Sequence, residues 1–398
     1  MLMKNQIHMH VLSALLLVML GACATQPTPP VGPGAKPSPP IVVTPPSAAP
    51  ALTISTWGAL PGWQDDNLKE AWVAFLQSCV ALKNKPTWQA VCAASVTLSN
   101  PDSVTVRAFF EQYLIPYQVS NPDGSNEGLI TGYYEPLLKG SRTSSTRFRY
   151  PLYGVPDDLL TIELSTVYPE LKHMRLRGRV QGKRVLPYYS RAEIENGTAA
   201  LKGREIVWVE NEIELFFLQI QGSGKIQLDS GETIRVGYAD QNGYPYKSVG
   251  KLLVERGELT LDKASMQGIQ DWGVRNPGKL TELLNQNASY VFFRESPESS
   301  NGPIGALGVP LTARRSIAVD PRAIPLGAPA FLSTTWPNSA KPLNQLMLAQ
   351  DTGGAIKGSV RADFYWGFGN EAGQYAGSMK QKGKLWVLLP RTYIPAAP

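Results

Sequence analysis

Hydrophobic positions recur with two different periods along the chain. Between residues 66 and 97 apolar side chains repeat at helical spacing on both sides of a break at Pro86, which predicts two helices. From about residue 104 onward, short runs rich in Val, Ile and aromatic residues are separated by Gly and Pro, a pattern typical of strands. We therefore expect a protein that is mainly β with some α.

Individual elements follow from the same pattern. Strands are predicted at residues 129–136, 205–220, 315–319, 329–332, 345–349, 362–366 and 385–389. Helices are predicted at 247–256, at 262–273 and from Asn276-Pro277 onward, where Asn is an N-cap and Pro starts the helix. Many short strands with Gly and Pro between them indicate a barrel or a sandwich.

The amino-terminal segment differs from the rest. After Lys4, an apolar run at residues 11–20 is too short to span a bilayer. The sequence Leu-Gly-Ala-Cys that ends at Cys23 is similar to the lipobox of bacterial lipoproteins. We expect residues 1–22 to be a signal peptide and Cys23 to be lipidated, with an ordinary signal peptide as the alternative. Because Ala24 follows Cys23, the resemblance implies an outer-membrane lipoprotein of a Gram-negative bacterium that faces the periplasm.

Residues 23–51 are predicted to be a tether. Residues 24–50 contain ten prolines, so they cannot build a core and favour polyproline II. At ~3.1 Å per residue such a segment reaches up to about 80 Å. A lipid anchor with a stiff tether suits an enzyme that works at a fixed distance from the membrane; a generic lipoprotein linker is the alternative.

Composition and charge limit the kinds of site and of binding partner that we expect. The chain of 398 residues is too long for a single core, and two domains are expected. Its net charge of +6 is diffuse, with no Lys/Arg block of the kind that binds nucleic acid. Of three histidines, His8 and His10 fall in the predicted signal peptide, and we interpret His173 as a surface residue. We expect no metal and no cofactor, and catalysis by carboxylates.

Cys79 and Cys92 lie in the predicted helical pair, on either side of Pro86. If Cys23 is lipidated in an oxidising periplasm, these two are the remaining thiols, and we expect them to form a disulfide that closes a helical hairpin. Two buried free thiols are the alternative.

The most informative segment runs from Asp351 to Asp363 through a Gly-rich connection. If that connection folds back, both carboxylates reach one side of a sheet, and paired carboxylates in unlike environments are the usual equipment for cleaving glycosidic bonds. Phe364 or Trp366 would raise the pKa of Asp363 by desolvation, so that it holds a proton. The alternative is that each Asp bonds the backbone of a turn, and the residues alone favour this for Asp351.

Ordered motifs cover nearly the whole chain after the tether. They are Thr131-Gly-Tyr-Tyr-Glu-Pro, Phe216-Phe-Leu-Gln-Ile-Gln-Gly-Ser-Gly, Gly237-Tyr-Ala-Asp-Gln-Asn-Gly, Ser289-Tyr-Val-Phe-Phe, Arg315-Ser-Ile-Ala-Val-Asp-Pro-Arg and Asp351-Thr-Gly-Gly-Ala-Ile-Lys-Gly. Together they resemble the membrane-bound lytic murein transglycosylase A family with its C-terminal 3D domain. The resemblance implies a double-psi β-barrel from residues 52–135 and 292–398. A second β-rich domain, residues 136–291, would be inserted, with saccharide in the groove between the two.

The resemblance also implies an activity. The family cleaves the β-1,4 bond between N-acetylmuramic acid and N-acetylglucosamine in peptidoglycan without water and leaves 1,6-anhydromuramic acid ends. The family's catalytic acid corresponds to Asp363, which would act first as acid and then as base. Asp351 would tune it through like charge, and Asp320 is a further matching carboxylate. Peptidoglycan glycan strands and the outer membrane are the expected partners of a monomer.

Saccharide binding needs aromatic rings and amides. The candidates are Tyr133, Tyr134, Gln219, Gln221 and Trp366, with core packing as the alternative for each. Glu135 is a possible second carboxylate. Two rival functions are an inverting peptidoglycan glycoside hydrolase on the same barrel and a non-catalytic cell-wall binding module.

Overall fold

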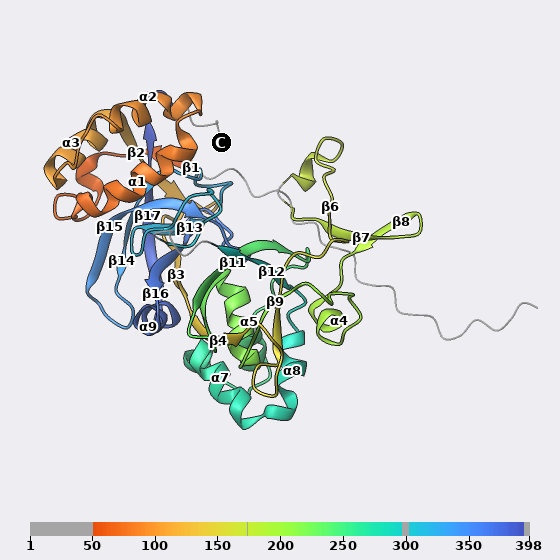
Figure 1. Ribbon diagram of the computed structural model, residues 1–398. Helices are drawn as coiled ribbons and strands as arrows, with labels where there is room; N and C mark the ends of the chain where they lie inside the picture. Colours follow the sequence, from red (N-terminus) through yellow and green to blue (C-terminus); the bar gives the residue numbers. More distant parts are fainter. Residues whose placement is uncertain (1–50, 173, 297–301, 394–398) are drawn as a thin grey trace, which may run out of the picture. The chain divides into compact units, whose positions relative to one another are not determined.

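The structure, a computed structural model, describes residues 51–172, 174–296 and 302–393 (Figure 1). The predicted signal peptide, the predicted lipidation site Cys23, most of the tether, and His173 therefore lie outside the described residues. Within the described part, no helix has the length and apolar character needed to cross a membrane. Most regular structure is in sheets accompanied by short helices, which confirms the expected mainly β fold with α.

The larger sheet has eight strands in the order β1-β2-β17-β14-β15-β13-β16-β3. They are β1 (Ala51–Ile54), β2 (Leu114–Ser120), β3 (Gly128–Glu135), β13 (Ser316–Val319), β14 (Pro329–Thr335), β15 (Pro342–Asp351), β16 (Arg361–Phe368) and β17 (Lys380–Pro390). Because β3 also pairs with β17, the strands from β17 to β3 form a closed ring of pairings. The double-psi connectivity stays a prediction.

The main core contains consecutive residues of β14, β15 and β17, whereas from β16 it takes only Ala362, Phe364 and Trp366. Strand residues Ile130, Phe331, Leu346, Phe364 and Val387 are fully buried in it. Side chains alternate between the two faces of a strand, so every second residue of β16 faces this core. The residues between them, which include Asp363, face the other side.

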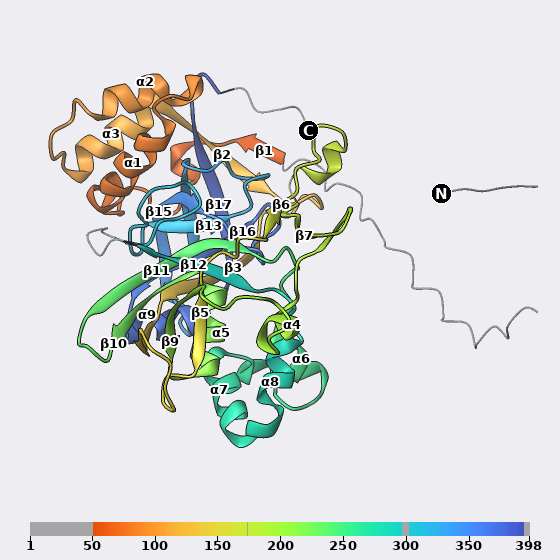
Figure 2. The ribbon, with the colours of Figure 1, turned by 45° about the vertical axis from the view of Figure 1, so that its right-hand side comes forward.

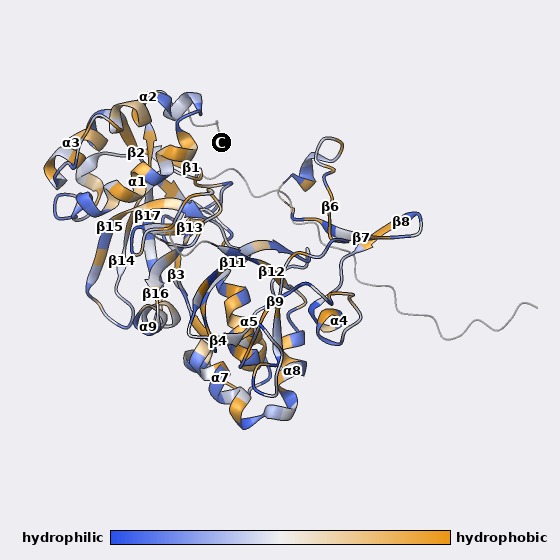
Figure 3. Cartoon of the chain, viewed as in Figure 1, coloured by the Kyte–Doolittle hydropathy of each residue, from blue (hydrophilic) through white to orange (hydrophobic). Residues whose placement is uncertain are grey.

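Three helices pack on the same core, namely α1 (Leu68–Leu82), α2 (Pro86–Ser95) and α3 (Ser103–Tyr113). The two helices predicted within residues 66–97 are confirmed, and both combine hydrophobic and hydrophilic residues (Figure 3). Helix α3 lies where strands were predicted to begin, so that prediction was wrong. Asp102 caps α3 by accepting a hydrogen bond from the Thr105 amide, and its buried residues recur at helical spacing.

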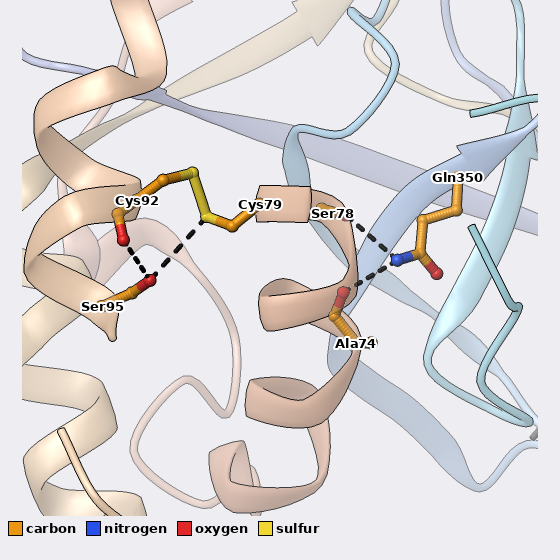
Figure 4. Close-up of a disulfide and its surroundings, with 6 residues drawn as sticks. All are labelled: Ala74, Ser78, Cys79, Cys92, Ser95 and Gln350. Carbon is orange, nitrogen blue, oxygen red and sulfur yellow. Dashed lines mark hydrogen bonds between the residues drawn. A yellow bond between two sulfur atoms is a disulfide. The ribbon is translucent and has the colours of Figure 1, made fainter. Parts of the chain in front are cut away.

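Figure 4 shows how α1 is tied to α2 on one side and to β15 on the other. Cys79 and Cys92, the two cysteines expected to pair, are joined by a disulfide. On the other side, the buried amide of Gln350 donates hydrogen bonds to the Ala74 carbonyl (2.8 Å) and to Ser78 Oγ (3.0 Å). Gln350 immediately precedes Asp351, so α1 fixes the end of the strand that carries this carboxylate.

The second sheet has six strands in the order β12-β11-β10-β4-β9-β5 (Figure 2). They are β4 (Leu137–Ser141), β5 (Tyr150–Tyr153), β9 (Glu205–Val209), β10 (Ser223–Leu228), β11 (Thr233–Gln241) and β12 (Val291–Ser296). A third sheet consists of β6 (Leu160–Thr161), β7 (Arg177–Gln181) and β8 (Arg184–Pro187). We expected the barrel to resume near residue 292, but β12 pairs with β11, so the larger sheet resumes at β13. The division into domains stays a prediction.

The remaining helices are short. They are α4 (Arg191–Glu195), α5 (Glu212–Gln221), α6 (Val249–Glu255), α7 (Met266–Arg275), α8 (Pro277–Asn285) and α9 (Asn370–Ser378), with 3-10 turns at Trp57–Ala59, Pro169–Leu171 and Leu261–Lys263. The helices predicted at 247–256, at 262–273 and from Pro277 are confirmed as α6, α7 and α8.

The prediction of one β-rich stretch over residues 205–220 was wrong in its second half. Strand β9 ends at Val209, and helix α5 follows. The Asn211 side chain accepts hydrogen bonds from the amides of Ile213 and Glu214, which caps the new helix. Gly222, with a φ of 80°, then ends it in the left-handed conformation.

Candidate active site

Asp363 lies within β16 on the face opposite the main core. Its neighbours Ala362 and Phe364 are fully buried, whereas Asp363 is half-buried. The pairing register sets Asp363 opposite Ala318 of β13 and opposite Thr131 of β3. Ala318 also lies opposite Asp351 at the end of β15. The two carboxylates therefore flank Ala318 in one row, two strand spacings or about 10 Å apart at their Cα atoms.

Among residues 51–172, 174–296 and 302–393, one hydrogen-bond donor lies on the carboxyl of Asp363. The Thr131 hydroxyl donates to Asp363 Oδ1 over 2.5 Å. Burial raises the pKa of Asp363, and the nearby Asp351 charge raises it further, while the bond from Thr131 and the charge of Arg361 lower it. Burial dominates, and the net pKa is raised, so this carboxyl is suited to carry a proton at higher pH than an exposed Asp.

Asp351 accepts hydrogen bonds from a side chain and from the backbone. The Tyr133 hydroxyl donates to Oδ2 over 3.0 Å, and the Ala306 amide donates to Oδ1 over 2.9 Å. Burial raises the pKa of Asp351 more than these bonds lower it. Asp351 therefore bonds backbone, as the turn alternative expects, and also shares a row with Asp363.

Asp320 has a different environment. It is buried and accepts hydrogen bonds from the Arg322 guanidinium, the Arg322 amide and the Gly358 amide. Burial would raise its pKa, but the bonds from Arg322 and from the two amides outweigh burial and hold the pKa at about 2. Asp320 is thus an ionised group that ties residues 320–322 to the Gly-rich connection, and it does not carry a proton at neutral pH.

The aromatic candidates divide between the two faces of the sheet. Tyr133 lies on the same face as Asp363 and bonds Asp351, with its ring 5.2 Å from that of Tyr365. Trp366 belongs to the main core, where it stacks on Tyr375 at 4.7 Å. Because Trp366 is an odd number of residues from Asp363 along one strand, it faces away from the carboxylate. Saccharide binding by Trp366 stays a prediction.

Tyr134 and the two glutamines also lie apart from Asp363. Tyr134 packs in the main core, and its amide donates to Gln221 Oε1 over 3.0 Å. These two residues line a cavity of about 160 Å³ together with Gly132, Tyr246 and Met266. Gln219 is buried and accepts a hydrogen bond from Arg191. Both glutamines are engaged in holding α5, so saccharide binding by them stays a prediction.

Glu135 has a structural partner instead of a free carboxylate. It is buried and forms an ion pair with Arg235 of β11 at 3.2 Å, and the Tyr365 hydroxyl donates to its other oxygen over 3.2 Å. Burial raises its pKa against the lowering effect of Arg235. The pair joins β3 of the larger sheet to β11 of the second sheet.

Two residues at the site were not among those predicted. Thr131 bonds Asp363, and Arg361 donates to Thr131 Oγ1 over 2.8 Å. Thr131 opens the first of the motifs quoted above, and Arg361 is two residues before Asp363, on the same face of the strand. In the described ranges no group of acidic, His or Cys side chains is arranged to hold a metal ion.

Comparisons with known proteins were made for the whole chain. The family model "MltA specific insert domain" matches residues 129–294, and the "3D domain" model matches residues 315–389. Membrane-bound lytic murein transglycosylase A of Escherichia coli K12 is 36% identical over 280 residues, which cover 68% of each chain.

Solved structures are similar over a larger share of the chain. The crystal structure of MltA from Neisseria gonorrhoeae is 40% identical, covers 89% of this chain and 98% of its own, and has a TM-score of 0.76. Escherichia coli MltA with bound chitohexaose is 27% identical, covers 86% and 94%, and has a TM-score of 0.63. These matches extend across both sheets.

Proposed function

Because the chain belongs to the membrane-bound lytic murein transglycosylase A family, we propose that it cleaves the β-1,4 bond between N-acetylmuramic acid and N-acetylglucosamine in peptidoglycan. The products would carry 1,6-anhydromuramic acid ends. The observation that supports this most is Asp363, a half-buried carboxyl with a raised pKa that bonds Thr131 and shares a row with Asp351.

In the first step Asp363 acts as a general acid. Its carboxyl gives a proton to the bridging oxygen, the bond from C1 of the muramic acid to that oxygen breaks, and the N-acetylglucosamine leaves with a hydroxyl. A carboxyl serves this purpose only if it is protonated at the working pH, and burial raises the pKa of Asp363 in that direction.

In the second step the same group acts as a general base. The carboxylate takes the proton of the C6 hydroxyl, and O6 bonds to C1 to close the anhydro ring. Asp363 thereby regains its proton, and no water is consumed. One carboxyl suffices because the sugar supplies the nucleophile, and acid–base help of this kind contributes about 10²–10⁴-fold.

Asp351 is proposed to tune Asp363. Its charge, when present, disfavours a second negative charge in the same row and so keeps the proton on Asp363. The bonds from Tyr133 and Ala306 fix it in place. Tyr133 is the candidate aromatic residue that remains on this face for contact with saccharide.

The alternative of an inverting hydrolase is favoured by one observation. Asp351 and Asp363 are two carboxyls in one row, and inverting enzymes use two carboxyls about 6.5–9.5 Å apart with a water between them. In that alternative, Asp351 would be the base for a water, and the product would have a reducing end.

Muropeptide analysis tests the proposal. Purified protein is incubated with peptidoglycan sacculi, and the released fragments are weighed by mass spectrometry. We expect fragments lighter by one water than hydrolytic products and without a reducing end, and we expect none from Asp363→Asn. Reducing ends would support the hydrolase, and release that is equal for both proteins would exclude Asp363 as catalyst. Binding without release by either would support a wall-binding module.

The membrane anchor is a separate part of the proposal. We propose that Cys23 is lipidated and holds the protein at the outer membrane on the periplasmic side; the relative in Escherichia coli is named membrane-bound. Because each buried methylene contributes about 0.8 kcal/mol, several acyl chains give stable attachment. Metabolic labelling with a palmitate analogue is expected to mark the wild-type protein and not Cys23→Ala, and equal labelling of both would contradict the anchor.

A further inference from the structure

Arg361 is a charged side chain close to Asp363 to which the mechanism above gives no part. We propose that Arg361 is a positioning residue that acts through Thr131, fixing the direction of the Thr131 hydroxyl and therefore the oxygen on which Asp363 carries its proton. The inference rests on the proposed function of Asp363 and adds a residue to it.

A chain of hydrogen bonds links the three residues. Arg361 Nη2 donates to Thr131 Oγ1 over 2.8 Å, and Thr131 Oγ1 donates to Asp363 Oδ1 over 2.5 Å. Arg361 Nη1 donates to the carbonyls of Leu129 (3.2 Å) and Ala362 (2.5 Å). The guanidinium is thus held by backbone of both β3 and β16, the two strands that carry Thr131 and Asp363.

These contacts determine where the protons are. A guanidinium has only donors and stays charged, so Thr131 must accept from Arg361. A hydroxyl has one hydrogen and two lone pairs; Arg361 takes one lone pair, and we assign the hydrogen to the short bond with Asp363 Oδ1. Since Oδ1 is an acceptor in both protonation states, the acidic proton of neutral Asp363 is on Oδ2. One oxygen is therefore fixed by the protein, and the other is left to exchange protons with the substrate.

The charge of Arg361 acts in the same direction as the hydroxyl. Both lower the pKa of Asp363, against burial and the Asp351 charge, which raise it. The titratable and charged groups around Asp363 from the neighbouring strands are Arg361, Tyr365, Tyr133, Asp351 and, opposite Thr131 on β17, Lys380. A group that is acid in one step and base in the next works best with a pKa near the working pH. Arg361 keeps the carboxylate form accessible for the second step.

The kinetics of an Arg361 variant distinguish action through Thr131 from direct contact with the substrate. Soluble glycan strands serve as substrate, and kcat and KM are measured across pH. We expect Arg361→Met to lower kcat about ten-fold with little change in KM, because the acid loses its fixed geometry. We also expect the alkaline limb of the kcat–pH profile of Arg361→Met to shift to higher pH by at least about half a unit, because a positive charge near the carboxyl is lost.

A double-variant cycle tests whether Arg361 acts through Thr131. Thr131→Val keeps the shape of the side chain and removes the hydroxyl, and we expect it to lower kcat at least as much as Arg361→Met. Adding Arg361→Met to Thr131→Val is expected to lower kcat no further. Arg361→Lys, which keeps the charge, is expected to retain the wild-type alkaline limb with an intermediate kcat.

Arg391 provides the matched control. It also donates to two backbone carbonyls, those of Gln112 (2.7 Å) and Glu111 (2.9 Å), and its described hydrogen bonds are on the segment that precedes β2. We expect Arg391→Met to leave kcat and the pH profile unchanged. Thermal unfolding of every variant verifies folding. If Arg361→Met does not fold, the kcat and the pH profile of Arg361→Lys test the inference instead.

Three results would overturn the inference. They are a rise in KM with unchanged kcat for Arg361→Met, losses of kcat that multiply in the double variant, and an unchanged pH profile. The proposed function is tested separately in the same assay by the wild-type protein and Asp363→Asn. If wild type releases anhydro products and Asp363→Asn does not, a wild-type kcat and pH profile for Arg361→Met contradict only the proposed role of Arg361.

Discussion

Asp363 and Asp320 are two aspartates of the larger sheet and its loops with opposite environments. Asp320 accepts bonds from a guanidinium and two backbone amides, which hold its pKa at about 2. Asp363 accepts one bond, from a hydroxyl, and burial raises its pKa. The guanidinium and the two amides on Asp320 outweigh its burial, whereas the hydroxyl on Asp363 does not, and this difference decides which carboxyl carries a proton.

Matched Asp→Asn variants at the two positions are expected to give the largest difference. Asp363→Asn removes the acid and the base of the reaction, so its kcat on glycan strands is expected to fall about 10²–10⁴-fold. Asp320→Asn is expected to stay within about ten-fold of wild type at a temperature at which it is folded, since Asp320 positions a loop and exchanges no proton. Similar losses for both variants would remove the distinction.

The free energy of unfolding is expected to fall for Asp320→Asn, the variant that keeps most of its activity, and not for Asp363→Asn. Asp320→Asn loses charged hydrogen bonds to Arg322 and Gly358, and we expect its free energy of unfolding to fall by about 2–3 kcal/mol at neutral pH. The pKa of Asp320 is depressed from 3.8 in the unfolded chain to about 2 in the folded protein. Its contribution is therefore complete above about pH 4 and lost as the pH falls toward 2. Chemical denaturation at a series of pH values measures this; a loss that is independent of pH would contradict the assignment.

Asp363→Asn is expected to make the protein more stable at neutral pH. The pKa of Asp363 is raised on folding, so the folded protein binds this proton more tightly, and wild type loses stability as the pH rises through that pKa. Asn does not ionise and avoids this loss. The two proteins are expected to be equally stable in acid, below the unfolded pKa. An Asn variant that is less stable than wild type at neutral pH would contradict a raised pKa.

Tyr133→Phe is expected to have the smallest effect. The change removes the hydrogen bond to Asp351 Oδ2 and leaves the ring in place. The pKa of Asp351 should rise because that bond lowers it, and kcat should fall only about three- to ten-fold, since Asp351 acts through Asp363. Measurement of kcat and KM on glycan strands distinguishes this tuning from saccharide contact by the phenol, which would raise KM.

Part of the site could be predicted from the sequence, but alternation along the strands was not used in choosing its residues. The sequence predicted β16 and the two aspartates, and the structure sets both in one row. The same alternation implies that Trp366 faces opposite to Asp363 and that the adjacent Tyr133 and Tyr134 cannot both face it. Choosing residues by chemical type alone placed Trp366 and Tyr134 at the site.

Other features depend on contacts between distant segments. Thr131 meets Asp363 only because β3 and β16 pair in parallel, although the two residues are 232 positions apart in the sequence. No local pattern indicates that pairing. Helix α5 was mistaken for a strand because its residues are mostly apolar and β-forming, and the cap at Asn211 is the local signal that identifies it.

The most direct test of the central claim is digestion of peptidoglycan in water labelled with heavy oxygen. If Asp363 passes a proton to the bridging oxygen and then activates the sugar's own hydroxyl, the muramic acid ends made by the wild-type protein contain no label. Heavy oxygen at C1 of those ends would show that water is the nucleophile and would contradict a single carboxyl acting as acid and then as base.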